Sequence, residues 1–470
     1  MAKTDQVAEL VVVGGGPGGY AAAFHAADLG LSVTLIDPEK NPGGVCLYRG
    51  CIPSKALLHV ARVIGEAKES ETAGVSFGAP KIDLDKLRTF KTGVVERLTS
   101  GLGQLSRARK ITFIQGRARF TAANELEVTG VDGAKSRLSF TQAIIATGSR
   151  AATLKTLPDH ERVMNSRQAL DLPDIPKRLL VVGGGYIGAE MASVYAALGS
   201  KVTMVELTGG LLPGVDRDLV KPLETRIKTV LESLLLKTKV ASAKVQGKAV
   251  LVEFDGPDGK RQETFDRLLV AVGRVPNSQD IGLDKLGIAV DDKGFIPVDL
   301  ARRTKLAHIF AIGDVAGQPM LAHKASHEGQ VAAAAAAGKK VAFEPQAIPA
   351  VVFTDPEVAW CGLTEDDAKR TGVEVKIGKF PWAASGRALT MGRSDGLTKI
   401  VVEAATGRVL GVGLVGPGAG ELIAEGVLAV EMAAVADDLA LTIHPHPTLS
   451  ETVMEAAASV FGKSLHYYGR

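Results

Sequence analysis

The sequence contains few cysteines, few aromatic residues and no long apolar segment. It has 3 cysteines in 470 residues, and a chain of this length buries enough apolar surface to be stable without a disulfide scaffold. Aromatic residues make up 5% of the chain, and no apolar run approaches the roughly 18 residues that a membrane-crossing helix needs. The amino terminus has no charged segment followed by a signal-length apolar stretch. We therefore expect a cytoplasmic protein.

Charge of one sign is not in large excess either. The 55 basic and 52 acidic side chains leave a net charge of +3, which is too small to indicate a nucleic-acid partner. In the reducing cytoplasm, two cysteines close in sequence indicate catalysis or metal binding rather than structural support. Cys46 and Cys51 form such a pair, and Cys361 lies far away in the chain.

An internal repeat organises the first half of the chain. Residues 10–37, "LVVVGGGPGGYAAAFHAADLGLSVTLID", align with residues 179–206, "LLVVGGGYIGAEMASVYAALGSKVTMVE", at a constant offset of 169. Each copy reads as an apolar strand, a glycine turn, an alanine-rich helix and a second strand that ends in an acid. That order is the opening βαβ unit of a dinucleotide-binding domain, and it occurs twice.

Each copy carries the G-x-G-x-x-G pattern followed by an acid. The three glycines permit a tight turn, close approach of a pyrophosphate, and packing of helix on strand, and the acid accepts hydrogen bonds from ribose hydroxyls. A lone copy would be weak support for dinucleotide binding, whereas two copies with matching spacing are strong support. The predicted residues are Gly14, Gly16, Gly19 and Asp37 in the first copy, and Gly183, Gly185, Gly188 and Glu206 in the second.

The acid of the second copy indicates which nicotinamide cofactor binds. A carboxylate at Glu206 would repel the 2′-phosphate of NADP, and no arginine follows it in "VELTGG". NAD is therefore expected at the second site. Two nucleotide sites in one chain suit a tightly held flavin that exchanges electrons with a diffusible nicotinamide.

Further apolar runs predict the domain order. Strand-like segments at 142–149, 267–274 and 308–314 each reach a glycine near their end. The last follows the second repeat, so we expect the first domain to resume there. The fold class is thus α/β, with two Rossmann-like domains, one inserted in the other, and a C-terminal α+β domain. The predicted boundaries are 1–152 and 276–348 for the flavin domain, 153–275 for the NAD domain and 349–470 for the third.

The cysteine pair lies in "GGVCLYRGCIPSK", residues 43–55. On a regular helix two residues five apart are too distant for a disulfide, so Cys46 and Cys51 can bond only where the segment is tightened or irregular. Gly43, Gly44 and Gly50 make that possible. With Pro53 in the first turn of the next helix, Cys51 lies at a helix amino terminus, where a thiolate is stabilised.

A redox role is favoured over a zinc site for this pair. No second Cys or His pair with ligand spacing accompanies it, so we expect no metal. Lys55 is predicted to lie near the flavin ring and stabilise its reduced, anionic form. Glu190, in the second glycine motif, is a candidate partner for Lys55, although two ordinary exposed charges remain an alternative reading.

The C-terminal histidines offer a candidate base. "IHPHPTLSETVMEAA" places His444 and His446 two residues apart, and Glu451 follows the second by five. The prolines prevent a helix until about Thr448, where a capped start is expected. Glu451 could then orient the ring of His446, as in general acid–base catalysis. Spacing alone does not choose between the two histidines, and a purely structural histidine remains an alternative.

Together these stretches resemble the flavoprotein disulfide reductases, the class I pyridine nucleotide-disulfide oxidoreductases, and most closely their lipoamide branch. The resemblance covers essentially the whole chain. Its motifs are the first glycine turn, residues 43–55, "ATGS", "GGGYIGAE", "VGRVPN", "FAIGDVAGQPMLAHKASHEG" and "HPHPTLSE".

The resemblance implies roles for individual residues. Cys46 would exchange with lipoamide, Cys51 would lie against the flavin, and His446 with Glu451 would serve as the base in the partner subunit's active site. The C-terminal domain would build an obligate homodimer. Implied FAD contacts are Gly44, Val45, Lys55, Ala118, Thr147, Gly148, Asp314, Leu321 and Ala322. Implied NAD contacts are Tyr186, which would cover the nicotinamide face of the flavin, Ile187, Val240, Gly273 and Arg274.

The sequence departs from the family pattern in places. Between the cysteines the family usually has Leu-Asn-Val-Gly, and this chain has "LYRG", with Tyr48 and Arg49. Val45 replaces a common threonine, Asp37 a glutamate and Pro445 an alanine. None of these changes removes a catalytic group, but Arg49 could change the flavin potential or the preferred lipoyl partner.

The expected activity is oxidation of dihydrolipoamide, carried on a separate lipoyl protein, by NAD through a Cys46–Cys51 disulfide and FAD. One alternative is an NAD(P)H-dependent reductase of another disulfide or of a metal ion, against which Glu206 argues. A redox-responsive binding protein without turnover is a second alternative. The intact cysteines, Lys55 and His446 argue against this second alternative. Steady-state NADH oxidation would distinguish an enzyme from a binding protein without turnover.

Overall fold

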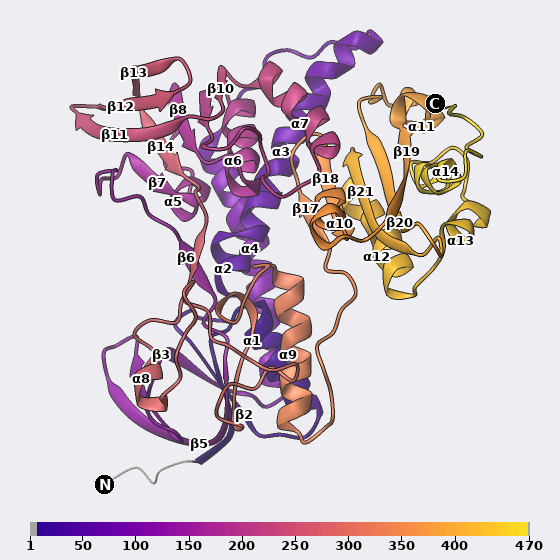
Figure 1. The fold of residues 1–470 in the computed structure, drawn as a ribbon. Helices are drawn as coiled ribbons and strands as arrows, with labels where there is room; N and C mark the ends of the chain where they lie inside the picture. Colours follow the sequence, from indigo (N-terminus) through magenta and orange to yellow (C-terminus); the bar gives the residue numbers. More distant parts are fainter. Residues whose placement is uncertain (1–6, 469–470) are drawn as a thin grey trace.

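The computed structural model of the chain describes residues 7–468. Its ribbon has a lower lobe, an upper lobe and a lateral C-terminal lobe, each built on its own sheet (Figure 1). Helices α1 (Pro17–Asp28) and α9 (Ala322–Ala336) pack side by side along the lower lobe, whereas α3 (Cys51–Glu69) runs upward from the junction of the lobes (Figure 1). The protein thus has the mixed α/β architecture that the sequence predicts.

The lower lobe contains the first βαβ repeat. Four parallel pairings run in the order β3-β2-β1-β5-β16, and β4 pairs antiparallel with the outer parts of β3 and β5. Strand β16 belongs to this sheet although the second repeat precedes it in the chain. The elements are β1 (Val7–Val13), α1 (Pro17–Asp28), β2 (Val33–Asp37), β3 (Thr112–Ala122), β4 (Glu125–Gly130), β5 (Lys135–Ile145), β16 (Ile309–Ala311) and α9 (Ala322–Ala336).

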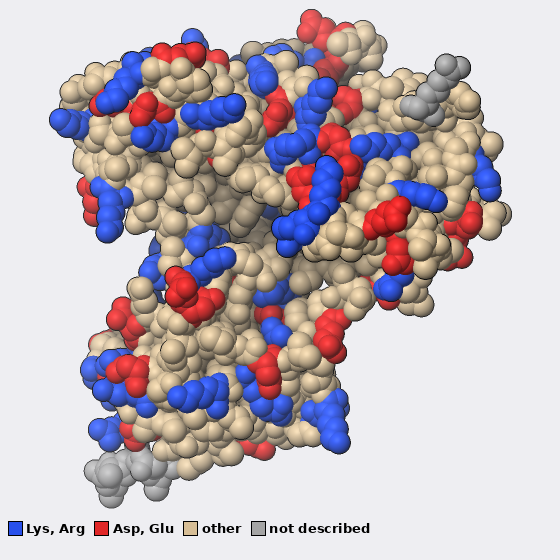
Figure 2. Space-filling view, in the orientation of Figure 1, with Lys and Arg blue, Asp and Glu red and all other residues tan. Residues whose placement is uncertain are grey.

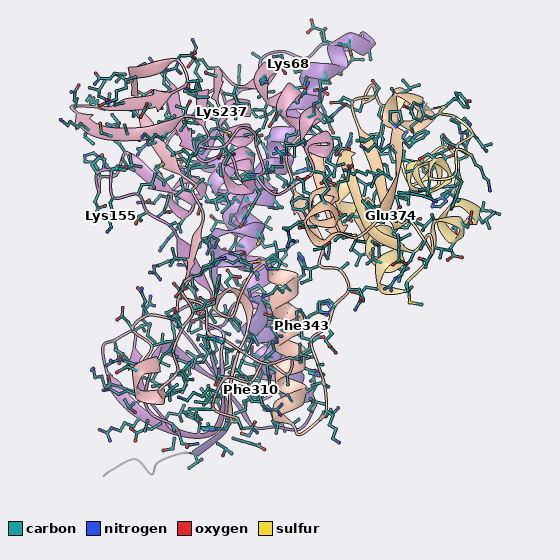
Figure 3. The ribbon with its side chains drawn as sticks, in the orientation of Figure 1. Lys68, Lys155, Lys237, Phe310, Phe343 and Glu374 are labelled. Carbon is teal, nitrogen blue, oxygen red and sulfur yellow. The ribbon has the colours of Figure 1, made fainter. Side chains whose placement is uncertain are left out.

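Apolar strands explain why this sheet is central to its lobe. The carboxyl-terminal halves of β1 and β5 are buried without alternation, as expected for parallel strands covered on both faces. Phe310 of β16 is 1% exposed, and Figure 3 shows it inside the lower lobe. Alanines of α9 pack against the sheet and against α1, because small side chains let the two helices approach closely.

The upper lobe repeats the same plan. Its parallel sheet has the order β10-β9-β8-β14-β7, with an antiparallel sheet, β11-β12-β13, beside it. Strands β6 and β15 pair antiparallel where the chain passes between the two lobes. The elements are β6 (Ser149–Ala151), β7 (Val163–Asn165), β8 (Arg178–Val182), α6 (Tyr186–Ala197), β9 (Lys201–Val205), α7 (Arg217–Val230), β10 (Ser233–Leu235), β11 (Lys239–Gln246), β12 (Ala249–Gly256), β13 (Gly259–Phe265), β14 (Arg267–Val270) and β15 (Arg274–Pro276).

The C-terminal lobe is an antiparallel sheet with helices, in the order β17-β18-β21-β20-β19. Its strands β18, β20 and β21 include most of the apolar stretches "VAWCGLT", "TKIVVEA" and "RVLGVGLVG". The elements are β17 (Ala350–Val352), β18 (Glu357–Gly362), α10 (Glu365–Thr371), β19 (Val375–Pro381), β20 (Leu397–Glu403), β21 (Val409–Gly416), α12 (Ala419–Glu431), α13 (Ala436–Leu441) and α14 (Glu451–Ser459).

One helix start differs from the expectation. We expected a capped helix from about Thr448, but α14 begins at Glu451 and no side chain caps it at Ser450. The Glu451 carboxylate accepts the Thr448 backbone N–H at 2.8 Å, as in the capping box that the expected start implies. The first turn is nevertheless tighter than an α-helix, because Thr452 N–H donates to the Leu449 carbonyl and Val453 N–H to the Ser450 carbonyl, each three residues back.

The surface has two notable properties. Figure 2 shows basic and acidic side chains interspersed on the visible face, which is hollowed between the lower and upper lobes. Large apolar side chains are exposed on the C-terminal lobe, namely Leu428 (62%), Met432 (72%), Leu441 (80%) and Ile443 (95%). Within residues 7–468, no helix combines the length and apolarity that crossing a membrane requires.

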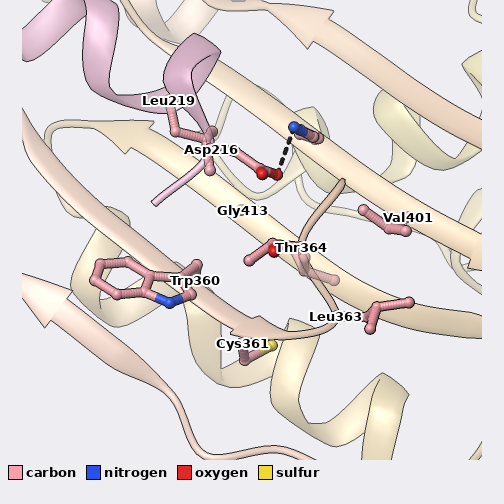
Figure 4. A pocket seen from close by; sticks show the side chains of 10 residues that line it. Asp216, Leu219, Trp360, Cys361, Leu363, Thr364, Val401 and Gly413 are labelled. Atoms are coloured by element: carbon pink, nitrogen blue, oxygen red, sulfur yellow. Dashed lines mark hydrogen bonds and ion pairs between the residues drawn. The ribbon is translucent and has the colours of Figure 1, made fainter. Parts of the chain in front are cut away.

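A buried lysine joins the upper lobe to the C-terminal lobe. Lys399 of β20 is 2% exposed, and its Nζ lies 2.6 Å from Asp216, 3.0 Å from Asp218 and 2.5 Å from Glu365. Figure 4 shows the ion pair with Asp216 beside Leu219, which packs on the sheet at Gly413. Although burial lowers the pKa of Lys399, its acidic partners outweigh that effect and raise the pKa. The lysine therefore stays charged between the lobes.

We predict that Lys399→Met destabilises the protein by about 3 kcal/mol, because three carboxylates then lose a buried cation. The matched control is Lys369→Met, which removes a 74% exposed lysine 3.8 Å from Asp366 and should cost less than about 0.5 kcal/mol. Urea unfolding of both variants measures the free energies. Equal losses in the two variants would show that Lys399 does not hold the lobes together.

Candidate active site

The first glycine turn leaves room for a phosphate-bearing ligand. Gly14 has φ +105°, and a Cβ there or at Gly19 would collide with a backbone carbonyl, of Ala146 and of Gly14 respectively. Helix α1 can therefore start directly against β1. No side chain caps this helix at Gly16, so its first amides are free to meet an anion. Gly44 packs against Gly16, and a Cβ on it would enter this space. The turn fits a dinucleotide pyrophosphate.

The second glycine turn has the same construction. Gly183 has φ +109°, and a Cβ at Gly188 would collide with the Gly183 carbonyl. Helix α6 starts after Gly185 without a side-chain cap. Among residues 7–468, apart from its own chain neighbours, no atom lies within 4 Å of the Cβ position of Gly185. The protein's own packing does not require this glycine, which suits close approach of a ligand.

The two predicted ribose acids also organise their own turns. Asp37 accepts a hydrogen bond from Gly15 N–H at 2.6 Å, and Glu206 accepts one from Gly184 N–H at 2.6 Å. Burial raises the pKa of Asp37, although the Gly15 N–H and the Arg49 charge oppose the rise. A carboxylate has further lone pairs for ribose hydroxyls. Each acid can therefore support its turn and meet a ligand at once.

The two cysteines meet where two helices join. Helix α2 (Gly44–Arg49) carries Cys46, and α3 (Cys51–Glu69) begins at Cys51, with the backbone irregular at Gly50 between them. Both are free thiols. The Cys46 thiol donates a hydrogen bond to Cys51 and, with the Lys55 ammonium, lowers the pKa of Cys51 to about 7 against the opposing effect of burial. The same hydrogen bond and burial raise the pKa of Cys46.

This asymmetry makes Cys51 the first of the two sulfurs to lose its proton, with Cys46 as the thiol that donates to it. A thiolate at the start of a 19-residue helix also has a favourable interaction with the helix dipole. The irregular backbone at Gly50, between α2 and α3, lets the two sulfurs come within hydrogen-bonding distance.

Lys55 and Glu190 form the predicted pair. Lys55 Nζ lies 3.0 and 2.9 Å from the two oxygens of Glu190, which is 3% exposed. Glu190 also accepts the backbone N–H of Phe353 at 3.0 Å. The Phe353 ring lies 4.5 Å from the Lys55 ammonium. Helices α3 and α6 and the segment after β17 thus converge on one carboxylate.

Phe353 is a contact that sequence reasoning missed. Nothing near it in sequence resembles a cofactor motif, and its partners Lys55 and Glu190 lie in other lobes. Its position in an apolar stretch followed by "TDPEVAW" predicts only a strand end. An aromatic ring beside a lysine becomes visible only in the folded chain.

A series of hydrogen bonds connects strands β6 and β15, between the lower and upper lobes, to Asp314. Ser149 Oγ donates to Asp314 at 2.5 Å and accepts from Arg274 Nε at 2.7 Å. Arg274, implied above as an NAD contact, thus lies 3.9 Å from Asp314, implied as a flavin contact. Burial raises the pKa of Tyr186 and the charges of Asp314 and Cys51 add to the rise, while Arg274 opposes it. Tyr186 is 41% exposed beside these groups.

The remaining candidate residues occupy the same strand ends and helix starts, or lie on more distant strands. Thr147 donates its hydroxyl to the Asn277 carbonyl at 2.8 Å, and Gly148 and Gly273 have φ of +70° and +124°. Leu321 precedes α9 and Ala322 begins it, whereas Val45 is 38% exposed on α2. Ile187 lies in the first turn of α6, Ala118 on β3 and Val240 on β11.

His446 and Glu451, the candidate base and its partner, are hydrogen-bonded to each other. The single chain does not bring them to the cysteines. His446 is 75% exposed at its side chain, and its Nδ1 lies 2.9 Å from Glu451. Burial raises the pKa of Glu451, but the Thr448 N–H and the His446 ring outweigh it and lower the pKa. His444 instead pairs with Glu425 at 2.7 Å. Helix α14 lies on the outer side of the C-terminal lobe, away from α2 (Figure 1).

The chain matches two parts of one known family. Residues 8–329 match the family described as pyridine nucleotide-disulphide oxidoreductase, and residues 348–457 match the dimerisation domain of that family. The chain belongs to this family. It is therefore an oxidoreductase, and its two glycine turns fit the FAD and NAD that such a flavoprotein uses. The dimerisation domain supports a homodimer.

Curated relatives match almost the whole chain. A dihydrolipoyl dehydrogenase of Vibrio cholerae is 48% identical over 456 residues, which cover 97% of this chain and 95% of the relative. One of Thermus scotoductus is 46% identical over 468 residues, covering 98% and 99%. The crystal structure of LpdA from Mycobacterium tuberculosis superposes with a TM-score of 0.88 at 30% identity, covering 96% and 99%.

We predict that the hydrogen bond from residue 46 controls the pKa of Cys51. Cys46→Ser keeps a donor, and Cys46→Ala removes it. The pKa of Cys51 should therefore be higher in the alanine variant by about one pH unit, since a hydrogen bond to a charged group contributes about 1.5 kcal/mol or more. The thiolate exists above its pKa, so alkylation of Cys51 by iodoacetamide should begin at higher pH in Cys46→Ala.

Mass spectrometry of the Cys51 peptide measures the alkylation rate at each pH. Cys361 serves as an internal reference, because burial raises its pKa to about 12. Identical pH profiles in the serine and alanine variants would contradict the assigned hydrogen bond.

Proposed function

We propose that this protein is a dihydrolipoyl dehydrogenase, which oxidises protein-bound dihydrolipoamide to lipoamide and reduces NAD⁺. The observation that carries the proposal is the Cys46–Cys51 pair, with a depressed pKa at Cys51, next to the Lys55–Glu190 ion pair. This centre adjoins both dinucleotide turns. The relatives that match nearly the whole chain bear the same name.

The two cysteines exchange a disulfide with the substrate. In the oxidised enzyme a substrate thiolate attacks Cys46, the Cys46–Cys51 bond breaks, and Cys51 leaves as the thiolate. The second substrate thiol then displaces Cys46, and lipoamide departs as its cyclic disulfide. Two thiols of the substrate are oxidised and two cysteines are reduced.

FAD, when bound, supplies the path by which two electrons pass from the reduced cysteines to NAD⁺. The protein's part is to hold that path in place. Residues of the first turn, with Asp37, Gly44, Val45 and Lys55, would hold FAD near Cys51. Ala118, Thr147, Gly148, Asp314, Leu321 and Ala322 are proposed as its further contacts. Lys55, fixed by Glu190, would face the developing negative charge of the reduced ring.

The second turn is proposed as the NAD site. Glu206 places a carboxylate where NADP would carry its 2′-phosphate, which disfavours NADP. Tyr186, the first residue of α6, is close enough to Asp314 and Cys51 for their charges to raise its pKa, and it would cover the nicotinamide face of the flavin. Further proposed NAD contacts are Ile187, Val240, Gly273 and Arg274.

His446 is proposed to act as the base across a dimer. Glu451 accepts its Nδ1–H at 2.9 Å, which leaves Nε2 free to take a proton from a substrate thiol. Because the single chain keeps His446 away from its own cysteines, the proposed site combines His446 of one subunit with Cys46 of the other. A lipoyl-carrying protein would present the substrate there.

We propose that the chain divides into three domains. Residues 1–152 and 276–348 form the flavin domain, 153–275 the NAD domain and 349–470 the dimerisation domain. The cytoplasm is the proposed location. Reduction of another disulfide or of a metal ion with NADPH is not favoured, because the second turn carries Glu206.

We predict a spectral response to the substrate pair. Anaerobic addition of dihydrolipoamide to the purified yellow protein should produce a long-wavelength absorption band from the Cys51 thiolate beside the flavin. NAD⁺ should reverse the band, and NADP⁺ at the same concentration should not. A spectrum unchanged by dihydrolipoamide, together with a band produced by NADPH, would make the protein a reductase of a different disulfide.

We predict that two inactive chains complement each other. Cys51→Ser and His446→Gln chains, each inactive as homodimers, should give a heterodimer with about half the parental activity, because a C₂ dimer then retains one intact composite site. Differently tagged chains, co-expressed and purified through both tags, provide the heterodimer for steady-state assay. Complete inactivity of that heterodimer would place His446 and the cysteines of each site in one chain.

A further inference from the structure

The segment between Asp37, the first predicted ribose acid, and helix α2 is held in place by side chains of α2. Residues 38–43, here named the connecting loop, join Asp37 to Gly44. Asp37 holds the glycine turn at one end, and Gly44 packs on Gly16 at the other. The loop is also tied to the turn by Gly43 N–H, which donates to the Gly15 carbonyl at 2.7 Å. Any movement of the loop therefore changes both edges of the first dinucleotide site.

Tyr48 fastens the middle of the connecting loop to helix α2. Its hydroxyl donates to the Asn41 carbonyl at 3.0 Å and accepts the Asn41 N–H at 3.3 Å. One phenol thus satisfies both backbone groups of a single loop residue. The ring also closes on Gly43, since a Cβ there would lie 3.1 Å from its Cε2.

Arg49 fastens the beginning of the same loop. Its guanidinium forms an ion pair with Glu39, and both side chains are less than one third exposed, at 23% and 28%. The Glu39 N–H in turn donates to the Asp37 carboxylate at 2.9 Å. The arginine charge also acts on Asp37 directly and opposes the rise in its pKa. The end of α2 therefore reaches the ribose acid through one intervening residue.

We propose that Tyr48 and Arg49 are positioning residues that close the connecting loop over the flavin site and slow release of FAD. The pair of contacts, Tyr48–Asn41 and Arg49–Glu39, is here named the clasp. The inference rests on the proposed binding of FAD at the first glycine turn. These are the two positions at which the chain departs from the usual Asn-Val between the cysteines. Asparagine and valine carry neither a phenol nor a guanidinium, so they could not make these two contacts.

The test measures how fast FAD leaves the holoenzyme. Yellow protein is diluted into flavin-free buffer, and the flavin that remains bound is measured by absorbance after timed gel filtration. Tyr48→Phe removes only the hydroxyl and should speed release about fivefold to twentyfold, because two neutral hydrogen bonds are lost. Arg49→Gln should speed it about twofold to fivefold, as for a partly exposed ion pair.

Matched variants separate the clasp from general loosening of the fold. Arg49→Lys keeps the charge and should release FAD nearly as slowly as the parent. Arg49→Gln should have little further effect in a Glu39→Gln background, since the ion pair is already absent. Tyr48→Asn with Arg49→Val restores the family's usual pair and should fold, with release at least as fast as in Tyr48→Phe. Tyr468→Phe and Arg97→Gln, at exposed sites elsewhere, should leave release unchanged.

Salt adds a readout that a merely structural role would not give. Raising salt screens the Arg49–Glu39 pair, so release should quicken in the parent and respond less in Arg49→Gln. The proposal is overturned if Tyr48→Phe and the Asn-Val variant retain FAD as long as the parent. The role of Arg49 is overturned if Arg49→Gln speeds FAD release as much in the Glu39→Gln background as in the parent. A parent protein that binds no FAD would instead refute the proposed function.

Discussion

The ion pair between Lys55 and Glu190 is the contact on which the arrangement of the centre depends. Lys55 comes from the helix that starts at Cys51, and Glu190 from the helix that starts at the second glycine turn. The backbone of Phe353 then brings the C-terminal lobe to the same carboxylate. Because Glu190 is 3% exposed, an unpaired charge there would be costly. The three lobes are thereby held in one relative position around the cysteines.

Helix α3 transmits this constraint along its length. It starts beside the cysteines and runs to the upper edge of the molecule, where Figure 3 labels Lys68. Near its end Glu69 forms an ion pair with Arg226 of α7 and lies 4.0 Å from Arg393 of the C-terminal lobe. Both ends of the helix are thus fixed by charges from other lobes. A helix held at two ends keeps the thiolate of Cys51 in a constant position relative to both nucleotide sites.

Features with a local cause could be predicted from the sequence, and long-range contacts could not. The glycine turns, the repeat and the return of β16 follow from strand, turn and helix patterns a few residues long. The pairing of His446 with Glu451 follows from five residues of spacing. In contrast, Lys399 with Asp216 and Phe353 with Lys55 join positions far apart in the chain. Their side chains are ordinary, and only packing of the lobes gives them a role.

The cysteine segment shows the same division within a few residues. That Cys46 and Cys51 could meet was predictable from the glycines around them. The contacts of Tyr48 and Arg49 with Asn41 and Glu39 were not, because they depend on how the connecting loop folds back. The start of α14 was misplaced because its first hydrogen bonds span three residues rather than four, a tightening that the sequence pattern does not reveal.

The apolar side chains on the C-terminal lobe bear on how the protein assembles. Leu428, Met432, Leu441 and Ile443 are each more than 60% exposed in the single chain, and exposed apolar side chains that gather on one lobe mark a protein–protein interface. The folded state of a homodimer is favoured by mass action, so its stability rises with the concentration of the chain. Newly synthesised subunits at low abundance would therefore be the species most exposed to chaperones and proteases, and pairing would be the step that ends this exposure.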